Sequence, residues 1–326
     1  MNPLISICVP VYNVAPYIEH CVRSLMEQTY NKLEYIFVDD CSADNSIELV
    51  RSIVNQYPER CAHIRIIQNF ENRGVAYTRR ICIEVVKGEY VIWVDSDDYV
   101  EPNMAERLYT LLIQNQADVI SGGNYVNYRD KQWTEQPFPE FKHFDSISFP
   151  LQGVFCSLWG AIYKSELFHL ASLAPDGMDY LEDRLCRFKI ALSNAKIIYV
   201  NDLTYHYVLH DSSITSTVSK KNLEYFVQFW QIVDQLLGDY NLTDKYKDIV
   251  TYAKVQNKTS LMLHSNSMKI RKQYATLFYD EEKEVMHNLK RGYWLMCHLI
   301  HYKLWGLIHL YQCYINIRLR LKLALT

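Results

Sequence analysis

Four polar residues, Asp95-Ser96-Asp97-Asp98, directly follow the apolar run Tyr90–Val94, and this junction constrains the fold more than any other segment. The apolar run is typical of a buried strand, so the acidic residues lie at its carboxyl end. In open α/β folds, ligands bind at that edge of the sheet. Two carboxylates one residue apart can hold a divalent cation, which can hold a diphosphate. Taken alone, such a triplet is more often a solvated acidic turn.

Strand and helix patterns alternate along the first 120 residues. Short β-rich runs cover 4–9, 33–38, 64–67, 90–94 and 119–120, and helical spacing covers 18–26, 47–54, 74–86 and a segment from 102. Repeated strand–helix units predict an α/β fold: a mostly parallel, Rossmann-like sheet with helices on both faces. The aperiodic segment 132–150 indicates a loop-rich insertion, and 223–237 and 244–263 are expected to be helical.

Bulk composition narrows the class of protein. A length of 326 residues allows one large domain or two modest ones, and 49% apolar residues suffice for a sizeable core. A formal net charge of −3 gives no reason to expect a nucleic-acid partner. The nine cysteines form no CxxC pair, which favours a reducing compartment. The amino-terminal apolar run is interpreted as a first strand, not a signal peptide.

Residues at the ends of the first two expected strands are candidates for binding a nucleoside. Pro10 and Tyr12 could stack against a flat base, although a plain strand-ending turn explains them equally well. Asp40 could accept a hydrogen bond from a uracil-like ring or a ribose hydroxyl. The alternative for Asp40 is an N-cap of the following helix.

Other charged residues have a chemical and a structural interpretation. Arg79, on an expected helix, could meet a phosphate or be a solvated surface arginine. Glu182 and Asp183 begin an amphipathic helix, where acids favour the helix dipole but could also supply a general base. His206 and His210 lie in a Tyr-rich segment, and a lone histidine is more often structural. His210 could otherwise complete a metal shell or contact phosphate.

Together and in this order, the segments resemble the family 2 glycosyltransferases of the GT-A fold, which use sugar nucleotides. The segments that carry the resemblance are 6–13 (SICVPVYN), 24–30 (SLMEQTY), 38–46 (VDDCSADNS), 72–75 (NRGV), 88–98 (GEYVIWVDSDD) and Glu182-Asp183. The resemblance is strong over 4–125 and moderate to about 215. It implies a GT-A domain over 1–215, with a nucleotide-binding half at 1–125 and an acceptor half at 126–215. A helical C-terminal region with a basic aromatic tail covers 216–326.

The resemblance implies a role for each matching residue. The implied donor-binding residues are Pro10, Tyr12, Asp40, Arg79, Asp95 and Ser96. The implied metal ligand is Asp97, with His210 as the candidate second ligand, and the cofactor is Mn²⁺ or Mg²⁺. The implied acceptor-binding residues are Trp159 and Glu182, and Asp183 is the implied catalytic base.

The implied reaction is transfer of a sugar from a nucleoside diphosphate sugar, expected to be a UDP-sugar, to a hydroxyl of a glycan or lipid-linked saccharide, with inversion. One alternative is a catalytically inactive module that binds a nucleotide-sugar or glycan. A sugar-nucleotide pyrophosphorylase would need a Gly-rich loop after the first strand, where this chain has Pro10 to Pro16. That alternative is therefore disfavoured.

Four positions depart from the family pattern. Leu181 and Cys41 stand where glycine is common, Arg80 stands where asparagine is common, and Ala161 stands where a basic residue often occurs. None of these changes removes a carboxylate that the chemistry needs. They bear on donor preference and on the turn before Glu182.

The C-terminal tail differs in charge from the rest of the chain. From Val285 to Thr326 there are six Lys or Arg residues and no Asp or Glu. Polar residues interrupt its apolar stretch, so an interfacial helix fits better than a spanning one. We expect a cytoplasmic protein, peripheral on the inner face of the plasma membrane. The alternative is a helix packed on the protein's own core or on a partner subunit.

Overall fold

The computed structural model describes residues 2–129, 131–136, 145–171, 173–210, 220–265, 267–285, 287, 289, 291–311 and 313–314. The chain divides into two compact units. The first comprises Met1–Pro150 and Val154–His210, and the second comprises Leu151–Gly153 and Asp211–Thr326. The predicted domain boundary at 215 lies outside the described residues.

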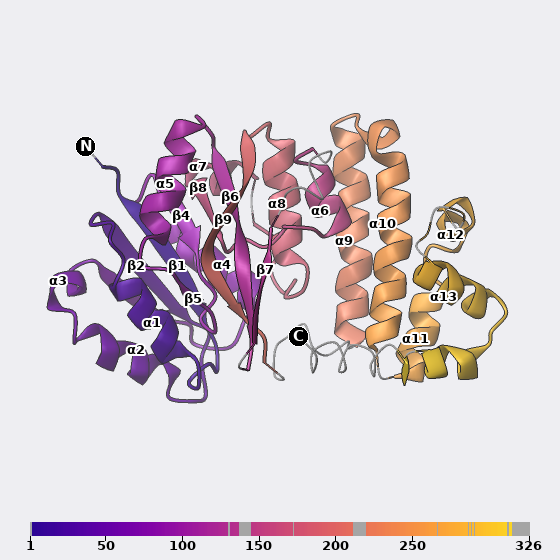
Figure 1. The fold of residues 1–326 in the computed structure, drawn as a ribbon, viewed down its shortest axis with the longest axis horizontal. Coiled ribbons are helices and arrows are strands. Elements are labelled where there is room, and N and C mark those ends of the chain that lie inside the picture. Colours follow the sequence, from indigo (N-terminus) through magenta and orange to yellow (C-terminus); the bar gives the residue numbers. More distant parts are fainter. Residues whose placement is uncertain are drawn as a thin grey trace. The chain divides into compact units, whose positions relative to one another are not determined.

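The described part of the first unit is built on a nine-stranded sheet with the order β3-β2-β1-β4-β8-β6-β9-β5, and β7 pairs with β6 (Figure 1). The strands are β1 (Ile5–Val11), β2 (Leu33–Asp39), β3 (Ile64–Gln68), β4 (Tyr90–Trp93), β5 (Tyr99–Val100), β6 (Val119–Tyr128), β7 (Lys131–Glu135), β8 (Ala161–Lys164) and β9 (Ile197–Val208). The sheet order places β1 and β4 next to each other, so the ends of these two strands share one edge.

Parallel pairing holds for the first four strands, as predicted. The pairs β1–β2, β1–β4 and β2–β3 are parallel. Beyond β4 the sheet is mixed: β4–β8, β6–β8, β6–β7 and β5–β9 are antiparallel, whereas β6–β9 is parallel. The predicted α/β architecture is therefore present, with its parallel part confined mainly to the first half of the domain.

Helices pack on both faces of the sheet, as the strand–helix pattern predicts. They are α1 (Ile18–Met26), α2 (Ser46–Val54), α3 (Pro58–Cys61), α4 (Val75–Val85), α5 (Met104–Gln114), α6 (Ser148–Gln152), α7 (Glu166–Ala171) and α8 (Glu182–Leu192). One core cluster joins α1, α2 and α5 to residues such as Ile7 and Ile92, and a second joins α4, α7 and α8 to residues such as Cys8 and Trp93. Neighbouring residues of β1 and β4 thus point to opposite cores.

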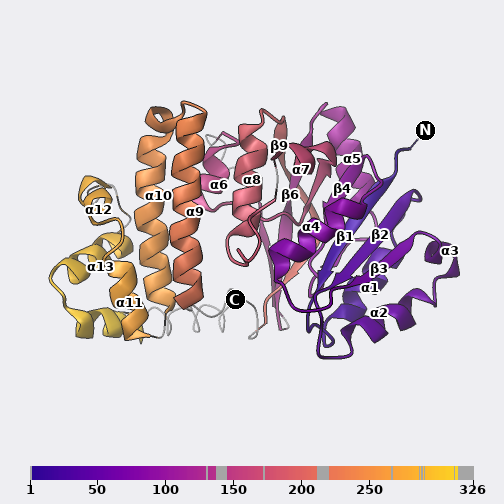
Figure 2. The same cartoon turned by 180° about the vertical axis from the view of Figure 1, so that it is seen from behind.

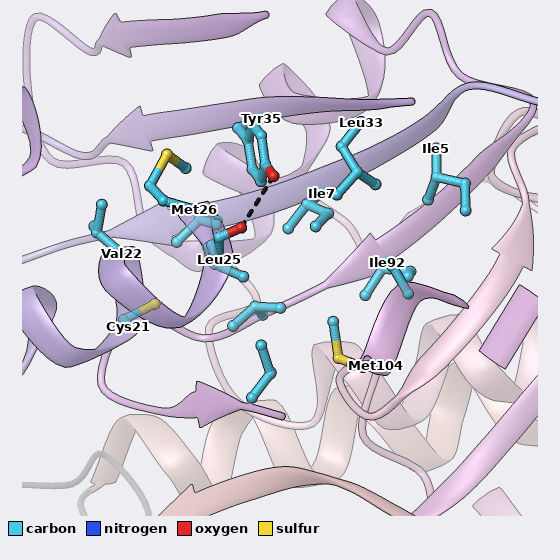
Figure 3. Packing of buried hydrophobic residues seen from close by; sticks show 14 of the residues in the cluster. Ile5, Ile7, Cys21, Val22, Leu25, Met26, Leu33, Tyr35, Ile92 and Met104 are labelled. Carbon is cyan, nitrogen blue, oxygen red and sulfur yellow. Dashed lines mark hydrogen bonds between the residues drawn. The ribbon is translucent and has the colours of Figure 1, made fainter. Parts of the chain in front are cut away.

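The first core shows why the N-terminal half of the domain is well specified. In Figure 3, side chains from α1, β1, β2 and β4 meet around Tyr35. Tyr35 is fully buried, and its hydroxyl donates a hydrogen bond to the carbonyl oxygen of Leu25 at 2.9 Å. The polar tip of this side chain is therefore satisfied inside the apolar core.

Five strands differ from the sequence-based expectation: β5 and β8 were not expected at all, and β6, β7 and β9 also differ. The short strand expected at 119–120 extends to Tyr128, the insertion at 132–150 begins with β7 and ends with α6, and β9 forms where no strand was expected. β6 and β9 run parallel, with register shifts around Gly123. Such long-range pairing stabilises segments whose local pattern is weak.

The second unit is helical over its described residues. Its helices are α9 (Lys220–Asp239), α10 (Thr243–His264), α11 (Met268–Ala275), α12 (Tyr279–Val285) and α13 (Arg291–His301), and α9 lies beside α10 (Figure 2). Lys258 and Glu282 form an ion pair that is almost fully buried, and the Lys258 ammonium also donates to the carbonyl oxygen of Leu277 at 2.9 Å. Within the described part of the chain, no helix is both long and apolar enough to cross a membrane.

Candidate active site

Arg79 connects the acidic turn after β4 with the start of α8. Its Nη2 atom donates to Asp95 Oδ1 at 3.1 Å and lies 3.2 Å from Asp183 Oδ1, and its Nε atom lies 3.9 Å from Glu182 Oε1. Arg79 is only 3% exposed and lies over the ring of Trp93. The predicted base, its neighbouring acid and the first acid of the D-x-D triplet therefore meet at one guanidinium group.

The position of Arg79 changes what its role can be. The guanidinium is buried beneath the three carboxylates, while the Asp95 and Asp183 side chains keep 28% and 19% of their surface exposed. In this arrangement Arg79 orients carboxylates. We expect any effect of Arg79 on a bound diphosphate to act mainly through them.

The Asp183 carboxylate is fixed from two sides. Its Oδ2 atom accepts a hydrogen bond from the backbone N–H of Leu158 at 3.2 Å. Its Oδ1 atom is close to Arg79 Nη2 but lacks hydrogen-bond geometry, and among the residues that the structure describes no other donor reaches it. One oxygen is thus held by the backbone, and the other keeps lone-pair capacity for a proton.

Electrostatics distinguish the acids of this cluster. Burial raises the pKa of Glu182 well above its ordinary value, and the neighbouring Asp183 charge raises it further. Burial also raises the pKa of Asp95 to about 6, against the lowering effect of Arg79. With several carboxylates around a single guanidinium, the site carries excess negative charge that favours a cation.

Asp97 and His210 form the other half of the site. The Asp97 Oδ2 and His210 Nε2 atoms are 2.7 Å apart, and the His210 ring stacks on Tyr17 with a centroid separation of 4.4 Å. Asp97 is not a solvated turn residue, because it is engaged by a side chain 113 positions away. Within the described ranges, no group of three His, Cys, Asp or Glu side chains forms a ready-made metal site.

Asp40 holds the segment before α4. Its carboxylate accepts hydrogen bonds from Asn69 Nδ2 at 2.8 Å and from the backbone N–H groups of Arg73 and Gly74 at 3.0 and 2.7 Å. The N-cap position of α2 is Asn45, so Asp40 is not a cap of that helix. It fixes the start of α4, the helix that carries Arg79.

Gly74 is required at its position. Its φ of +85° suits glycine, and a Cβ atom added there would lie 1.9 Å from Asp179 Oδ1. The residue therefore lets the chain segment before α8 pack directly on the start of α4. This contact helps to explain how Asp183 reaches Arg79.

Two departures from the family pattern fall on left-handed backbone. Leu181, at the N-cap of α8, has φ +66°, and Cys41 has φ +62°. Glycine adopts this conformation without steric cost, whereas a residue with a Cβ does not. At both places the chain therefore adopts a backbone conformation that suits glycine, and the residue present is strained.

The other two departures have different surroundings. Arg80 donates to Asp176 Oδ2 at 2.5 Å, and its neighbour Arg73 lies over the Tyr77 ring. Ala161 is fully buried at the start of β8. A basic side chain at position 161 would therefore have to enter the core in this fold.

The remaining predicted residues lie at the same edge of the sheet or beside it. Trp159 forms an isolated bridge with Trp93 and stacks on Tyr205 and Tyr207, with centroids 4.6 and 5.3 Å away. Ser96 is buried, Pro10 is half-buried near the end of β1, and Tyr12 is 47% exposed just beyond it.

Residues to which the sequence assigns no role in the reaction complete the cluster. Asp98 accepts a hydrogen bond from the Tyr205 hydroxyl, and Tyr17 supports His210. The sequence favours a structural role for His206, and the His206 Nε2 atom lies 2.8 Å from Glu101 Oε1. The alternation Tyr205-His206-Tyr207 is a strand signal that could have placed the two tyrosines on one face.

Comparison with known proteins assigns the chain to a family. The sequence profile described as "Glycosyl transferase family 2" matches residues 6–169. Glycosyltransferase GlyG of Streptococcus pneumoniae serotype 4 is 31% identical over 231 residues, which cover 67% of this chain and 74% of GlyG. The chain belongs to glycosyl transferase family 2. It is a glycosyltransferase.

Solved structures share the fold. S. aureus TarS 1-349 in complex with UDP-GlcNAc superposes with a TM-score of 0.71 at 19% identity, covering 96% of this chain and 91% of TarS 1-349. The mannosyltransferase PcManGT from Pyrobaculum calidifontis, in complex with GDP-Man and Mn²⁺, gives a TM-score of 0.54 at 18% identity, covering 94% and 87%. These likenesses confirm the predicted GT-A fold followed by a helical region.

Proposed function

We propose that this glycosyltransferase transfers a sugar from a nucleoside diphosphate sugar, a UDP-sugar in the first instance, to a hydroxyl of a saccharide or lipid-linked saccharide, with inversion. The observation that carries the proposal is the meeting of Asp95 and Asp183 at Arg79 Nη2, at 3.1 and 3.2 Å. It joins the acidic turn expected to face the donor to the expected base. The UDP-GlcNAc bound to the structurally similar TarS 1-349 supports the choice of donor class.

Asp183 is proposed as the general base. As the acceptor oxygen attacks the anomeric carbon, Asp183 takes the hydroxyl proton. The bond from the anomeric carbon to the diphosphate breaks, and its electron pair leaves with the diphosphate. Attack from the face opposite the leaving group inverts the configuration. The Leu158 N–H and Arg79 hold the carboxylate in position for this transfer.

Asp97 and His210 are the residues proposed to hold a divalent cation, Mn²⁺ or Mg²⁺. They offer one carboxylate and one imidazole side by side, a donor set that a cation can share with diphosphate oxygens and water. When bound, the cation would offset the negative charge that develops on the leaving diphosphate. The excess of carboxylates nearby supports a cation at this place.

Trp159 and Glu182 are proposed to meet the acceptor. The Trp159 ring is half-buried in an aromatic group with Tyr205 and Tyr207. Aromatic faces of this kind pack well on the apolar face of a sugar ring. Glu182 lies next to the proposed base and is only 13% exposed.

A peripheral membrane contact is proposed for the second unit. One side of α13 is buried through Met296, Cys297 and Ile300, so this helix packs on its own unit. Other apolar side chains in the same region stay exposed, namely Trp294, Tyr302, Leu304, Leu307, Leu310 and Tyr314. Exposed aromatic and aliphatic side chains, in a tail that has six Lys or Arg and no Asp or Glu over 285–326, fit an anionic lipid surface.

Co-sedimentation with anionic vesicles tests the membrane contact. The triple variant Trp294→Ser/Leu307→Ser/Leu310→Ser should bind vesicles more weakly than wild type while keeping its melting temperature. A chain ending at residue 290 should lose the binding. Equal sedimentation of all three proteins would reject the membrane proposal but leave the transferase proposal intact.

Ligand-dependent stability tests the donor proposal. Binding of the correct nucleotide raises the melting temperature by mass action. We expect UDP with Mn²⁺ to raise it more than UDP or Mn²⁺ alone, and the Asp97→Asn variant to lose the Mn²⁺-dependent part. GDP with Mn²⁺ serves as the competing nucleotide. If neither nucleotide shifts the melting temperature, with or without Mn²⁺, the donor proposal is wrong.

A further inference from the structure

Asp98 and Tyr205 lie beneath the site and have no part in the proposed reaction. They are 1% and 0% exposed. The Tyr205 hydroxyl donates to Asp98 Oδ2 at 2.6 Å, and the backbone N–H of Val208 donates to Asp98 Oδ1 at 2.7 Å. Both oxygens of a buried carboxylate are therefore used to hold the end of β9.

The Tyr205 hydroxyl has a second partner. It accepts a hydrogen bond from the backbone N–H of Asp95 at 3.1 Å. The turn itself is closed by the Asp98 N–H, which donates to the Asp95 carbonyl oxygen at 3.1 Å. One hydroxyl group thus connects the first and last residues of the acidic turn to β9.

These bonds determine where His210 lies. His210 follows Val208 by two residues, and its Nε2 atom is 2.7 Å from Asp97 Oδ2. Directly after Asp98, Tyr99 of β5 pairs with His206 of β9, so the chain on that side of Asp98 is also joined to β9. Asp97 comes from the turn and His210 from the chain after β9, so their separation depends on how firmly the two segments are joined.

We propose that Asp98 and Tyr205 are positioning residues, which attach the end of β9 to the acidic turn and thereby bring His210 to Asp97. This inference rests on the proposed function, in which Asp97 and His210 hold the cation. Removing a residue that orients a metal ligand without touching the metal itself typically weakens metal binding by about 10–100-fold. Hydrogen bonds to a buried carboxylate are well suited to this task because they are short and directional.

The test is a Mn²⁺ titration of the full chain, followed by the electron paramagnetic resonance signal of free Mn²⁺. It is done in the presence of UDP or GDP, whichever gives the larger thermal shift. Tyr205→Phe should weaken Mn²⁺ binding by about 10-fold or more. Tyr35→Phe is the matched control, because Tyr35 is also fully buried in this unit and its hydroxyl makes one hydrogen bond, to Leu25 (Figure 3). Thermal unfolding confirms that each variant is folded at the titration temperature.

A double-mutant cycle separates positioning from general loosening of the fold. If Tyr205 acts through His210, Tyr205→Phe should have little further effect on Mn²⁺ affinity in a His210→Ala background. Additive effects, or an unchanged affinity in Tyr205→Phe, would overturn the inference. If His210→Ala and Asp97→Asn both leave Mn²⁺ binding unchanged, the metal assignment itself is wrong. That result differs from the additive effects that would overturn the positioning role alone. A wild-type protein that binds no Mn²⁺ with either nucleotide would refute both.

Discussion

Asp95 and Asp183 share one nitrogen atom, Nη2 of Arg79, at 3.1 and 3.2 Å. The first carboxylate follows β4 and the second begins α8, so they are far apart in sequence. A single buried guanidinium sets the distance between the turn expected to face the donor and the expected base. The geometry of the site therefore depends on a residue that is itself shielded from solvent.

Substitution of Arg79 should separate its charge from its shape. Arg79→Lys keeps the charge but replaces the planar guanidinium, whose Nη2 atom meets both carboxylates, with a compact ammonium group. We expect transfer activity to fall by about 10-fold or more, with a small change in the free energy of unfolding. Arg79→Met leaves the carboxylates without a counter-charge and should destabilise the fold by about 3 kcal/mol. Urea unfolding and a transfer assay measure the two effects, and equal activity in Arg79→Lys and wild type would contradict the prediction.

Asp183→Asn should slow turnover without preventing donor binding. Loss of a positioned general base typically lowers the rate by about 10²–10⁴-fold. The nucleotide-induced rise in melting temperature should stay close to that of wild type. Asp202→Asn is a suitable control, because Asp202 pairs with Arg107 at 2.8 Å, apart from the carboxylate cluster. Wild-type rates in Asp183→Asn would rule out Asp183 as the base.

Leu181 should reverse the usual ranking of alanine and glycine. In a helix interior, a glycine variant is about 1 kcal/mol less stable than the alanine variant. We expect this order for Thr110→Gly and Thr110→Ala, at an exposed position in α5. At φ +66° the ranking should invert, with Leu181→Gly more stable than Leu181→Ala by about 1 kcal/mol. Chemical denaturation of the four variants measures both differences. The same ranking at both positions would show that no strain is stored at Leu181.

Glu182→Gln should change how stability depends on pH. Burial, reinforced by the Asp183 charge, raises the pKa of Glu182 above its ordinary value of 4.5. A raised pKa means that the folded state holds the proton more tightly than the unfolded state. The stabilisation is therefore complete below the ordinary value and is lost as the pH rises through the folded-state pKa.

Glutamine cannot ionise, so Glu182→Gln avoids this loss. The melting temperature of the variant relative to wild type should rise as the pH increases from about 5 to about 9. Differential scanning fluorimetry across that range measures the difference. A constant offset between the two proteins would mean that Glu182 has an ordinary pKa.

The helices and strands that could be predicted from sequence are those with a clear apolar pattern in their own residues. All seven residues of β2 are buried, and Tyr35–Val38 form a continuous apolar run that ends in acids. β6 could be followed only to Ile120, because Ser121 and the two glycines after it have weak strand propensity. Its full length depends on pairing with β9, which is distant in sequence.

The site shows the same division between local and long-range information. Asp97 and Asp183 were found from their positions at element ends, where chemistry in this kind of fold is concentrated. Tyr205 could not be found in this way, because its role exists only when β9 lies against the acidic turn. The buried position of Arg79 also depends on tertiary packing, so its sequence context indicated a phosphate contact and not a bridge between carboxylates.

Gly74 has a consequence for attempts to alter this enzyme. With φ +85° and the Asp179 carboxylate beside it, position 74 would strain the backbone of any other residue and force the Asp179 side chain to move. Random mutagenesis aimed at new sugar preferences should therefore yield mostly destabilised variants at this position. Useful diversity is to be sought among outward-facing side chains such as Tyr12, where a library can vary shape without disturbing the scaffold.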